Sequence, residues 1–234
     1  MILQEKNLKP EGKLTQKRIE DTCEEHKRKT RNRITSKDIW EGIKNKKIPF
    51  RMKDFIWKLI HNRHKVGNWF KRIPNWQDKA ICECGKVETM DHILIECRLN
   101  KSKDIWQEAE KIWKENNRDF KWTEPSVNIL RGLGAIKLKE RDKIAPNWIN
   151  ERYIEIVAET TWIIWTTRNK RIFDNIKLTK EEAIKKWKEM ISNKLETEKT
   201  IIKIEDKIKK KVEMQKDFDK KWKRNTRHED MEKT

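Results

Sequence analysis

The chain has 234 residues, carries a formal net charge of +19, and is 41% charged but only 35% hydrophobic. Six Gly and five Pro exclude a collagen-like or glycine-rich linker protein and argue against a turn-rich β-sandwich. High charge and low hydrophobic content are typical of disordered chains, but twelve Trp and many Ile recur at regular spacings and predict a folded protein.

No apolar run approaches the roughly 18 residues that a membrane-spanning helix requires. The N-terminal residues Met1–Lys6 lack the apolar core of a signal peptide. We therefore expect an intracellular protein, nuclear or cytoplasmic, with no membrane partner. In such a reducing compartment, four Cys favour metal ligands or free thiols over disulfides.

The positive charge is concentrated in two regions. Residues 1–80 and 175–234 are basic, whereas residues 81–174 are almost neutral. This distribution favours binding to a polyanion, most directly nucleic acid. The alternative is compositional drift, because Lys, Ile and Asn are all frequent here, as an AT-rich coding sequence would produce.

Helical spacing dominates the first two thirds of the chain. Residues 1–34 are polar and predict a basic arm that is poorly ordered or a frayed helix. Residues 35–175 predict a helical domain, in which Ser36 is placed to cap one helix and Pro49 to begin the next. Gly67 is expected to end that second helix or the turn after it. No run of alternating residues predicts a strand.

Two longer helices are expected towards the C-terminus. The segment after Pro146 is apolar on more than one side, which predicts a central helix with Trp162 and Trp165 in the core. Residues 176–234 predict a long basic amphipathic helix and tail, which begins at a capping box formed by Thr179 and Glu182. Its apolar stripe suggests a possible helix partner at 180–224.

Three of the four Cys lie close to a His in the segment 81–97. Cys82, Cys84, His92 and Cys97 have the spacing C-x-C, seven residues, then H-x4-C. Three thiolates and one imidazole form a complete tetrahedral set for one structural zinc ion. The single residue between Cys82 and Cys84 is fewer than the usual two to four. The alternative is that these Cys are small buried hydrophobic residues.

Neighbouring residues add to this interpretation. Gly85 permits a tight turn in which backbone amides can face the sulfur atoms. Asp91 is placed to accept a hydrogen bond from His92. Cys23 and His26 form a Cys-x2-His pair that could supply a replacement ligand, although they lie on a polar segment.

The stretch from about Lys37 to Trp113 resembles the zinc-binding domain that follows the polymerase in non-LTR retrotransposon reverse transcriptases. The matching residues are the helix Pro49–His61, the cluster with Glu88–Cys97, and Ile105-Trp106. The resemblance implies that the zinc ligands are Cys82, Cys84, His92 and Cys97, and the short gap in the first Cys pair is the departure from the family. The Trp-rich segment 159–173 is similar to the helix that follows this domain in fungal elements.

Sequence motifs of catalysis are missing. Polymerase chemistry needs paired aspartates, but the single Tyr, Tyr153, is followed by Ile154 and Glu155. No phosphate-binding glycine loop or nucleophile elbow occurs, so we expect no enzyme and no small-molecule substrate. The sequence predicts a zinc-dependent module that binds RNA or DNA through phosphate contacts. The candidate contacts are Arg51, Lys53, Lys58, Arg63, Lys65, Lys71 and Arg72.

Three questions stay open at this point. Trp69 and Trp76 lie among basic residues and are candidates for stacking on bases, or else for core packing. His61 and His64 could contact phosphate or ligate a metal, but we expect them to pack at a helix end. A rival interpretation is a protein-interaction module that acts through the C-terminal helix, and another is a decayed element fragment.

Overall fold

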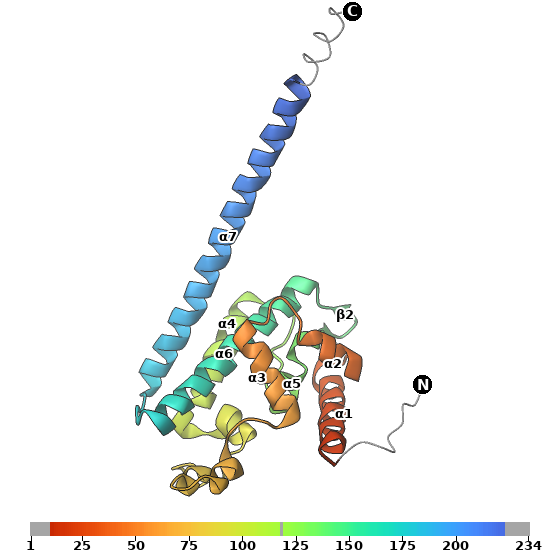
Figure 1. Cartoon of the computed structure of the whole chain (residues 1–234). Helices are drawn as coiled ribbons and strands as arrows, with labels where there is room; N and C mark the ends of the chain where they lie inside the picture. Colours follow the sequence, from red (N-terminus) through yellow and green to blue (C-terminus); the bar gives the residue numbers. More distant parts are fainter. Residues whose placement is uncertain (1–9, 118, 223–234) are drawn as a thin grey trace, which may run out of the picture. The chain divides into compact units, whose positions relative to one another are not determined.

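The computed structural model describes residues 10–117 and 119–222, and this part of the chain is mostly helical (Figure 1). Two compact units are distinguished, Met1–Lys188 and Glu189–Thr234. The predicted fold class is confirmed: the protein is mainly α, with a small turn at the Cys/His cluster and a long C-terminal helix. No helix in the described part of the chain has an apolar stretch long enough to cross a bilayer.

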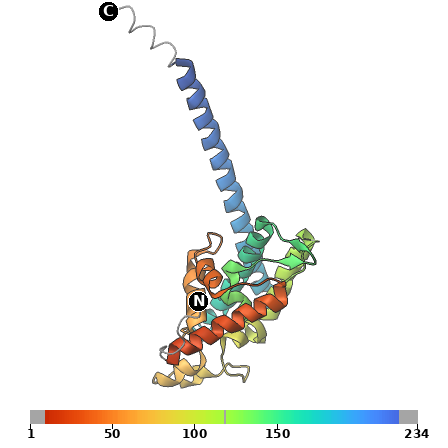
Figure 2. The same ribbon diagram turned by 90° about the vertical axis from the view of Figure 1, so that its right-hand side faces the viewer.

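Helix α1 (Pro10–Thr30) occupies most of the segment for which the sequence predicted a poorly ordered arm or a frayed helix. It packs against α5 (Val127–Arg131) and lies along the outer face of the first unit (Figure 2). Its inner side buries Thr22 and His26. The hydroxyl of Thr22 donates to a carbonyl one turn earlier at 2.7 Å, so this polar residue is buried with its hydrogen bond made. Hydropathy does not reveal a buried helix face that contains polar residues of this kind. Residues 1–9 of the predicted arm lie outside the described residues.

Helices α2 (Ser36–Gly42) and α3 (Phe50–His61) lead into the Cys/His segment. The N-cap of α2 is Thr35, which forms a capping box with Asp38, one residue earlier than predicted. Helix α3 follows Pro49, as predicted, and its apolar side is buried in the core. It ends in a left-handed residue, Asn62, at its C-cap, and not at a glycine.

Short helical turns and one small hairpin connect α3 to the central helix. The antiparallel hairpin contains two residues in each strand, which is too short for an alternating pattern to reveal it in the sequence. The remaining elements are η2 (Gly67–Arg72), η3 (Gln77–Ala80), η4 (His92–Glu96), η5 (Arg98–Asn100), α4 (Ser102–Asn116), η6 (Leu133–Ala135), β1 (Lys139–Glu140) and β2 (Lys143–Ile144).

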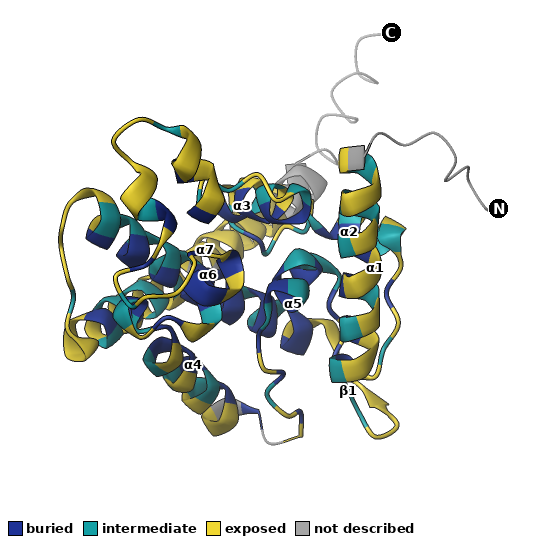
Figure 3. Cartoon of the chain, turned by 90° about the horizontal axis from the view of Figure 1, so that it is seen from below, coloured by how far each residue is buried: buried dark blue, intermediate teal, exposed yellow. Residues whose placement is uncertain are grey.

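Helix α6 (Asn147–Phe173) is the central helix of the first unit, as its apolar pattern predicted. It packs against α4, η4 and η5, and buried residues gather on α5 and α6 (Figure 3). Trp162 and Trp165 are half-buried, whereas the sequence predicted them in the core. The guanidinium of Arg51 lies 5.3 Å from the ring centroid of Trp162, so a cation covers part of this ring.

Helix α7 (Lys180–Trp222) begins with the predicted capping box. The Thr179 amide donates to the Glu182 carboxylate at 2.8 Å, and the Glu182 amide donates to the Thr179 hydroxyl at 3.2 Å. Its first turns belong to the first unit, where the buried Trp187 donates its indole N–H to the Thr160 hydroxyl at 2.9 Å. Residues 223–234, which include the last two positions of the predicted partner segment, lie outside the described residues.

Candidate metal centre

The first two Cys lie on a tight turn that the backbone holds closed. An isolated antiparallel bridge joins Ile81 to Val87 at the base of the turn. Inside it, the Cys82 amide donates to the Lys86 carbonyl and the Gly85 amide donates to the Cys82 carbonyl, each at 2.8 Å. Gly85 has a φ of +88°, a conformation that other residues rarely adopt, so its predicted role in the turn is explained.

The other two cluster residues lie at the start of the next helical turn, η4, and directly after its end. The buried carbonyls of η4 accept hydrogen bonds from side chains of η5 and α4. Asn100 and Ser102 donate to the Ile93 carbonyl at 3.1 and 2.9 Å, and the Trp106 indole donates to the Leu94 carbonyl at 2.8 Å. These three donors are buried, so they hold η4, with His92 at its start, against α4.

The four predicted side chains converge. One ligand atom from each of Cys82, Cys84, His92 and Cys97 lies within 4.8 Å of every other. The Sγ atoms of Cys82 and Cys97 are 3.7 Å apart, and the Cys84 Sγ is 3.3 Å from the His92 Nε2. A tetrahedral zinc ion with typical bond lengths separates adjacent donor atoms by about 3.5 to 3.8 Å. The donor set and its spacing therefore fit one zinc ion, even with a single residue between the first two Cys.

Burial and hydrogen bonding shift the pKa values of the ligand side chains and so affect whether each is protonated. Burial raises the pKa of the Cys82 thiol to about 12, and the opposing effect of the nearby Arg171 guanidinium offsets only part of this rise. Burial also acts to raise the pKa of Cys84, but hydrogen bonds from the Lys86 amide and the neighbouring thiols outweigh it and lower that pKa. Burial lowers the pKa of His92, which favours the neutral imidazole that a metal requires.

The second ring nitrogen of His92, Nδ1, is buried and has no hydrogen-bond partner among the described residues. The nearest carboxylate oxygen recorded beside it is Glu96 Oε2, at 3.9 Å, which is beyond hydrogen-bond distance. The sequence suggested Asp91 for this role, but Asp91 instead lines a hollow next to the cluster.

A buried ion pair joins the cluster segment to the central helix. Glu88 lies between the two halves of the cluster, and its carboxylate accepts two hydrogen bonds from Arg168 on α6. Both side chains are at most 1% exposed. Arg168 is also packed among aromatic rings, with its guanidinium carbon 5.7 Å from the Phe70 centroid and 5.3 Å from that of Trp165. No pattern in the sequence predicted this pair.

A second buried guanidinium reaches the cluster itself. Arg171, one helical turn after Arg168, donates to the Cys82 Sγ at 3.5 Å and to the Asn100 amide oxygen at 3.3 Å. It also pairs with Glu83 at 3.1 Å. Three thiolates and a neutral imidazole around Zn²⁺ leave a net negative charge, and a cation beside one sulfur offsets it. The sequence offered one signal for buried arginines here, because Arg168 and Arg171 are basic residues three apart on a helix predicted to lie in the core.

Gly67 has a packing role and not the helix-ending role that the sequence suggested. Its φ is +52°, and a Cβ atom there would lie 2.4 Å from the Glu88 carbonyl oxygen. No larger residue fits between η2 and the cluster segment. This close approach places Lys71 and Arg72 of η2, two of the predicted phosphate contacts, near the segment 81–97, which we call the Cys/His turn.

The predicted phosphate contacts divide into two groups. Arg51 pairs with the buried Glu159 on α6, while Lys53 donates to the Lys44 carbonyl at 3.4 Å and Lys58 pairs with Asp54 on its own helix. The other group flanks the Cys/His turn and consists of Arg63, Lys65, Lys71 and Arg72, all exposed. Arg51 and Lys58 are paired with carboxylates, and Arg63 of the second group is paired with Glu11. The second group differs in its position beside the Cys/His cluster.

The remaining candidates lie outside the cluster. His64 is 3.0 Å from the Phe55 carbonyl and packs between Phe55 and Trp165, and His61 packs on Trp57, which agrees with the expected packing role. His26 is fully buried on α1. Neither it nor Cys23 belongs to the metal-competent group found among the described residues.

Comparison with known families agrees with this site. Residues 22–106 match the family model described as zinc-binding in reverse transcriptase. The matched range runs from α1 into α4 and contains all four cluster residues, but it ends before Arg168 and Arg171. Comparison with curated proteins and with solved structures gives no match. Over residues 22–106 the chain is therefore similar to the zinc-binding domain of reverse transcriptases, as the Cys/His spacing and the preceding helix had indicated.

Proposed function

We propose that this chain is a non-enzymatic nucleic-acid-binding module of the nucleus or cytoplasm, similar to the C-terminal accessory region of a non-LTR retrotransposon reverse transcriptase. Zinc bound by Cys82, Cys84, His92 and Cys97 fixes the turn. The observation that carries the proposal is the position of the exposed cations of residues 63–72 beside that turn. Phosphate contacts of this kind position a nucleic acid without specifying its sequence.

The donor set supports a structural and not a catalytic ion. Four protein ligands complete a tetrahedral shell, whereas a catalytic zinc keeps one position for water or substrate. The buried Cys97 and His92 leave little room for such a position. The metal then supplies shape alone, and any chemistry on the nucleic acid belongs to another domain or protein.

Binding to labelled RNA and DNA as a function of salt tests the proposal. We expect one zinc per chain and an affinity that falls steeply with salt, because each phosphate contact releases about one counterion. The variant Arg63→Ala/Lys65→Ala/Arg72→Ala is expected to lose most of the affinity. A matched control, Lys103→Ala/Lys111→Ala/Lys114→Ala, removes the same charge from α4, outside the predicted contacts, and is expected to bind within about threefold of the unmodified protein. Binding that is weak for both nucleic acids and insensitive to salt would contradict the proposal.

A second candidate function is suggested by the second unit. In α7 from Glu189 onwards, Ile201, Ile204 and Ile208 are each about half exposed. Apolar side chains at helical spacings suit pairing with a partner helix. Sedimentation of the full chain and of an Ile204→Asp/Ile208→Asp variant separates the two candidates, because only the interaction module predicts an associated species that the variant abolishes.

A further inference from the structure

Two adjoining hollows next to the Cys/His turn contain both cations and aromatic rings. One has a volume of about 580 Å³ and lies between η2 and residues 87–91, and the other, of about 730 Å³, lies between α1 and the end of α3. Asn62, Arg63 and Arg72 line both of them. The two hollows therefore form one path over the surface, with the two guanidinium groups at its middle.

The ring of Trp69 lines the first hollow and packs on the buried ring of Phe70. It is 36% exposed, and it packs edge-on against the buried Phe70, with ring centroids 5.4 Å apart at 79°. Phe70 in turn packs against the buried Arg168 guanidinium. A partly exposed indole anchored in this way loses little conformational entropy when a flat ligand stacks on it. The Lys65 ammonium lies 5.0 Å from the centroid of the same ring and covers part of one face. When a base stacks on that face, this exposed side chain moves aside, and its ammonium group is then close enough to contact the neighbouring phosphate.

The second hollow also combines aromatic rings with cationic side chains. Trp40 and His61 line it, with ring centroids 5.6 Å apart, together with Arg18. The ion pair that Arg63 makes with Glu11 lies at the edge of this hollow. Both of its partners are mostly exposed, so the pair is weak and a phosphate can replace the carboxylate.

We infer that this path binds single-stranded RNA or DNA, with Trp69 stacking on a base and Arg63 and Arg72 contacting the phosphates between the two hollows. The inference rests on the proposed nucleic-acid function and adds the surface and the strand form. In a duplex the bases are already stacked and cannot reach Trp69, whereas every unpaired base offers a face to it. An acidic peptide would satisfy the cations but not the aromatic rings or the Asn62 and Asn68 amides beside them.

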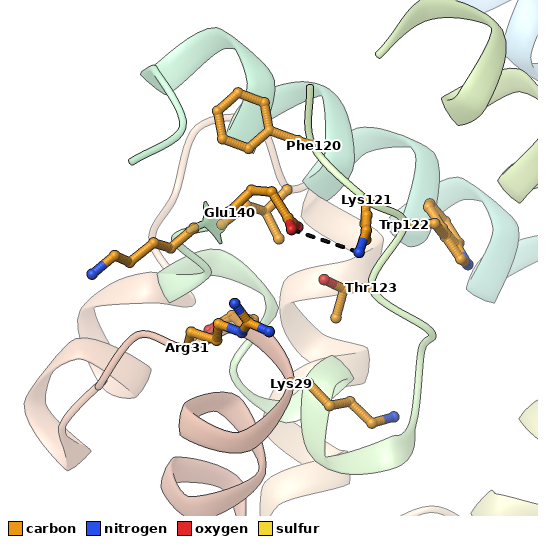
Figure 4. A pocket seen from close by; sticks show the side chains of 10 residues that line it. Lys29, Arg31, Phe120, Lys121, Trp122, Thr123 and Glu140 are labelled. Carbon is orange, nitrogen blue, oxygen red and sulfur yellow. Dashed lines mark ion pairs between the residues drawn. The ribbon is translucent and has the colours of Figure 1, made fainter. Parts of the chain in front are cut away.

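A third hollow shows why charge alone does not define the site. It has a volume of about 180 Å³ and is lined by Lys29, Lys121 and Glu140 among others (Figure 4). Lys121 pairs with Glu140 at 3.7 Å, and Lys29 pairs with Glu25 at 3.1 Å. Arg31 and Lys139 line it too, so this hollow is also cationic, and its smaller volume, not its charge, separates it from the path beside Trp69.

Fluorescence anisotropy with the full chain tests the inference. The probes are a labelled single strand of about 15 nucleotides, as RNA and as DNA, and the duplex of each. We expect the single strands to bind at least about tenfold more tightly than the duplexes. Trp69→Ala is expected to weaken single-strand binding by about 5- to 100-fold, and Arg63→Ala/Arg72→Ala to reduce the slope of log K against log salt by about two.

Trp148→Ala is the matched control, because Trp148 is 60% exposed and lines neither hollow. Unchanged circular dichroism and zinc content are required of each variant. Duplexes that bind as tightly as single strands, an unaffected Trp69→Ala, or equal displacement of the probe by poly-glutamate would each overturn the inference while leaving the metal centre intact. Failure of the unmodified chain to bind any nucleic acid would instead contradict the proposed function itself.

Discussion

Two pairs of arginines near the Cys/His turn use the same guanidinium group in opposite ways. One pair, Arg168 and Arg171, lies on α6, and the other, Arg63 and Arg72, precedes the turn in the sequence. The first two are at most 2% exposed and donate to Glu88, Asn100 and the Cys82 sulfur. The second two are exposed and line the hollows. The Cys/His turn thus has an inner side with paired cations and an outer side with cations that face solvent.

This difference separates what stabilises the turn from what can bind a ligand. A buried ion pair costs desolvation energy that only its partner offsets, so the loss of one member is severe. An exposed cation contributes little to folding and remains available to an anion. Variants on the inner side should therefore change stability and metal affinity, and variants on the outer side should change binding with little effect on the fold.

Removal of zinc gives the largest expected effect, because both sides of the turn depend on the metal. A strong chelator, or His92→Ala, is expected to lower the free energy of unfolding by at least about 5 kcal/mol and Tm by about 10 °C or more. Hydrogen exchange should show that amides of residues 81–97 lose protection first. Unchanged protection of these amides after complete zinc removal would show that packing alone maintains the turn.

Loss of one member of the buried ion pair comes next. Glu88→Gln leaves the Arg168 guanidinium buried without a counter-charge and is expected to lower the free energy of unfolding by about 3 to 5 kcal/mol, as urea denaturation would measure. The double variant Glu88→Leu/Arg168→Met removes both charges and is expected to recover most of that loss. If the double variant is less stable than Glu88→Gln, the ion pair itself supplies specific stabilisation.

The sequence predicted the parts of this comparison that depend on local spacing. The Cys/His spacing located the cluster, and helical periodicity located α3, α6 and α7. It did not predict the inner side, because Glu88 and Arg168 are 80 residues apart and resemble the exposed charges around them. The buried face of α1 was missed for a related reason, since the hydroxyls of its Thr residues find carbonyls only once the helix has formed.

Arg171 is expected to affect the metal more than the fold. Arg171→Met removes the donor to the Cys82 sulfur while keeping most of the side-chain volume, and we expect zinc affinity to fall by about 10- to 100-fold. Competition with a chromophoric chelator measures this change. Arg171→Lys keeps the charge and should restore part of the affinity, whereas equal affinities for all three proteins would show that the thiolates need no neighbouring cation.

The smallest effect on stability is expected on the outer side. Arg63→Ala breaks only the exposed pair with Glu11, so the free energy of unfolding should change by no more than about 0.5 kcal/mol in urea denaturation. Glu11→Ala should be equally neutral for stability, yet it should tighten binding to a single strand because it removes the carboxylate that competes with phosphate for Arg63. A loss above about 1 kcal/mol in either variant would place Arg63 with the inner arginines and remove the distinction between the two sides.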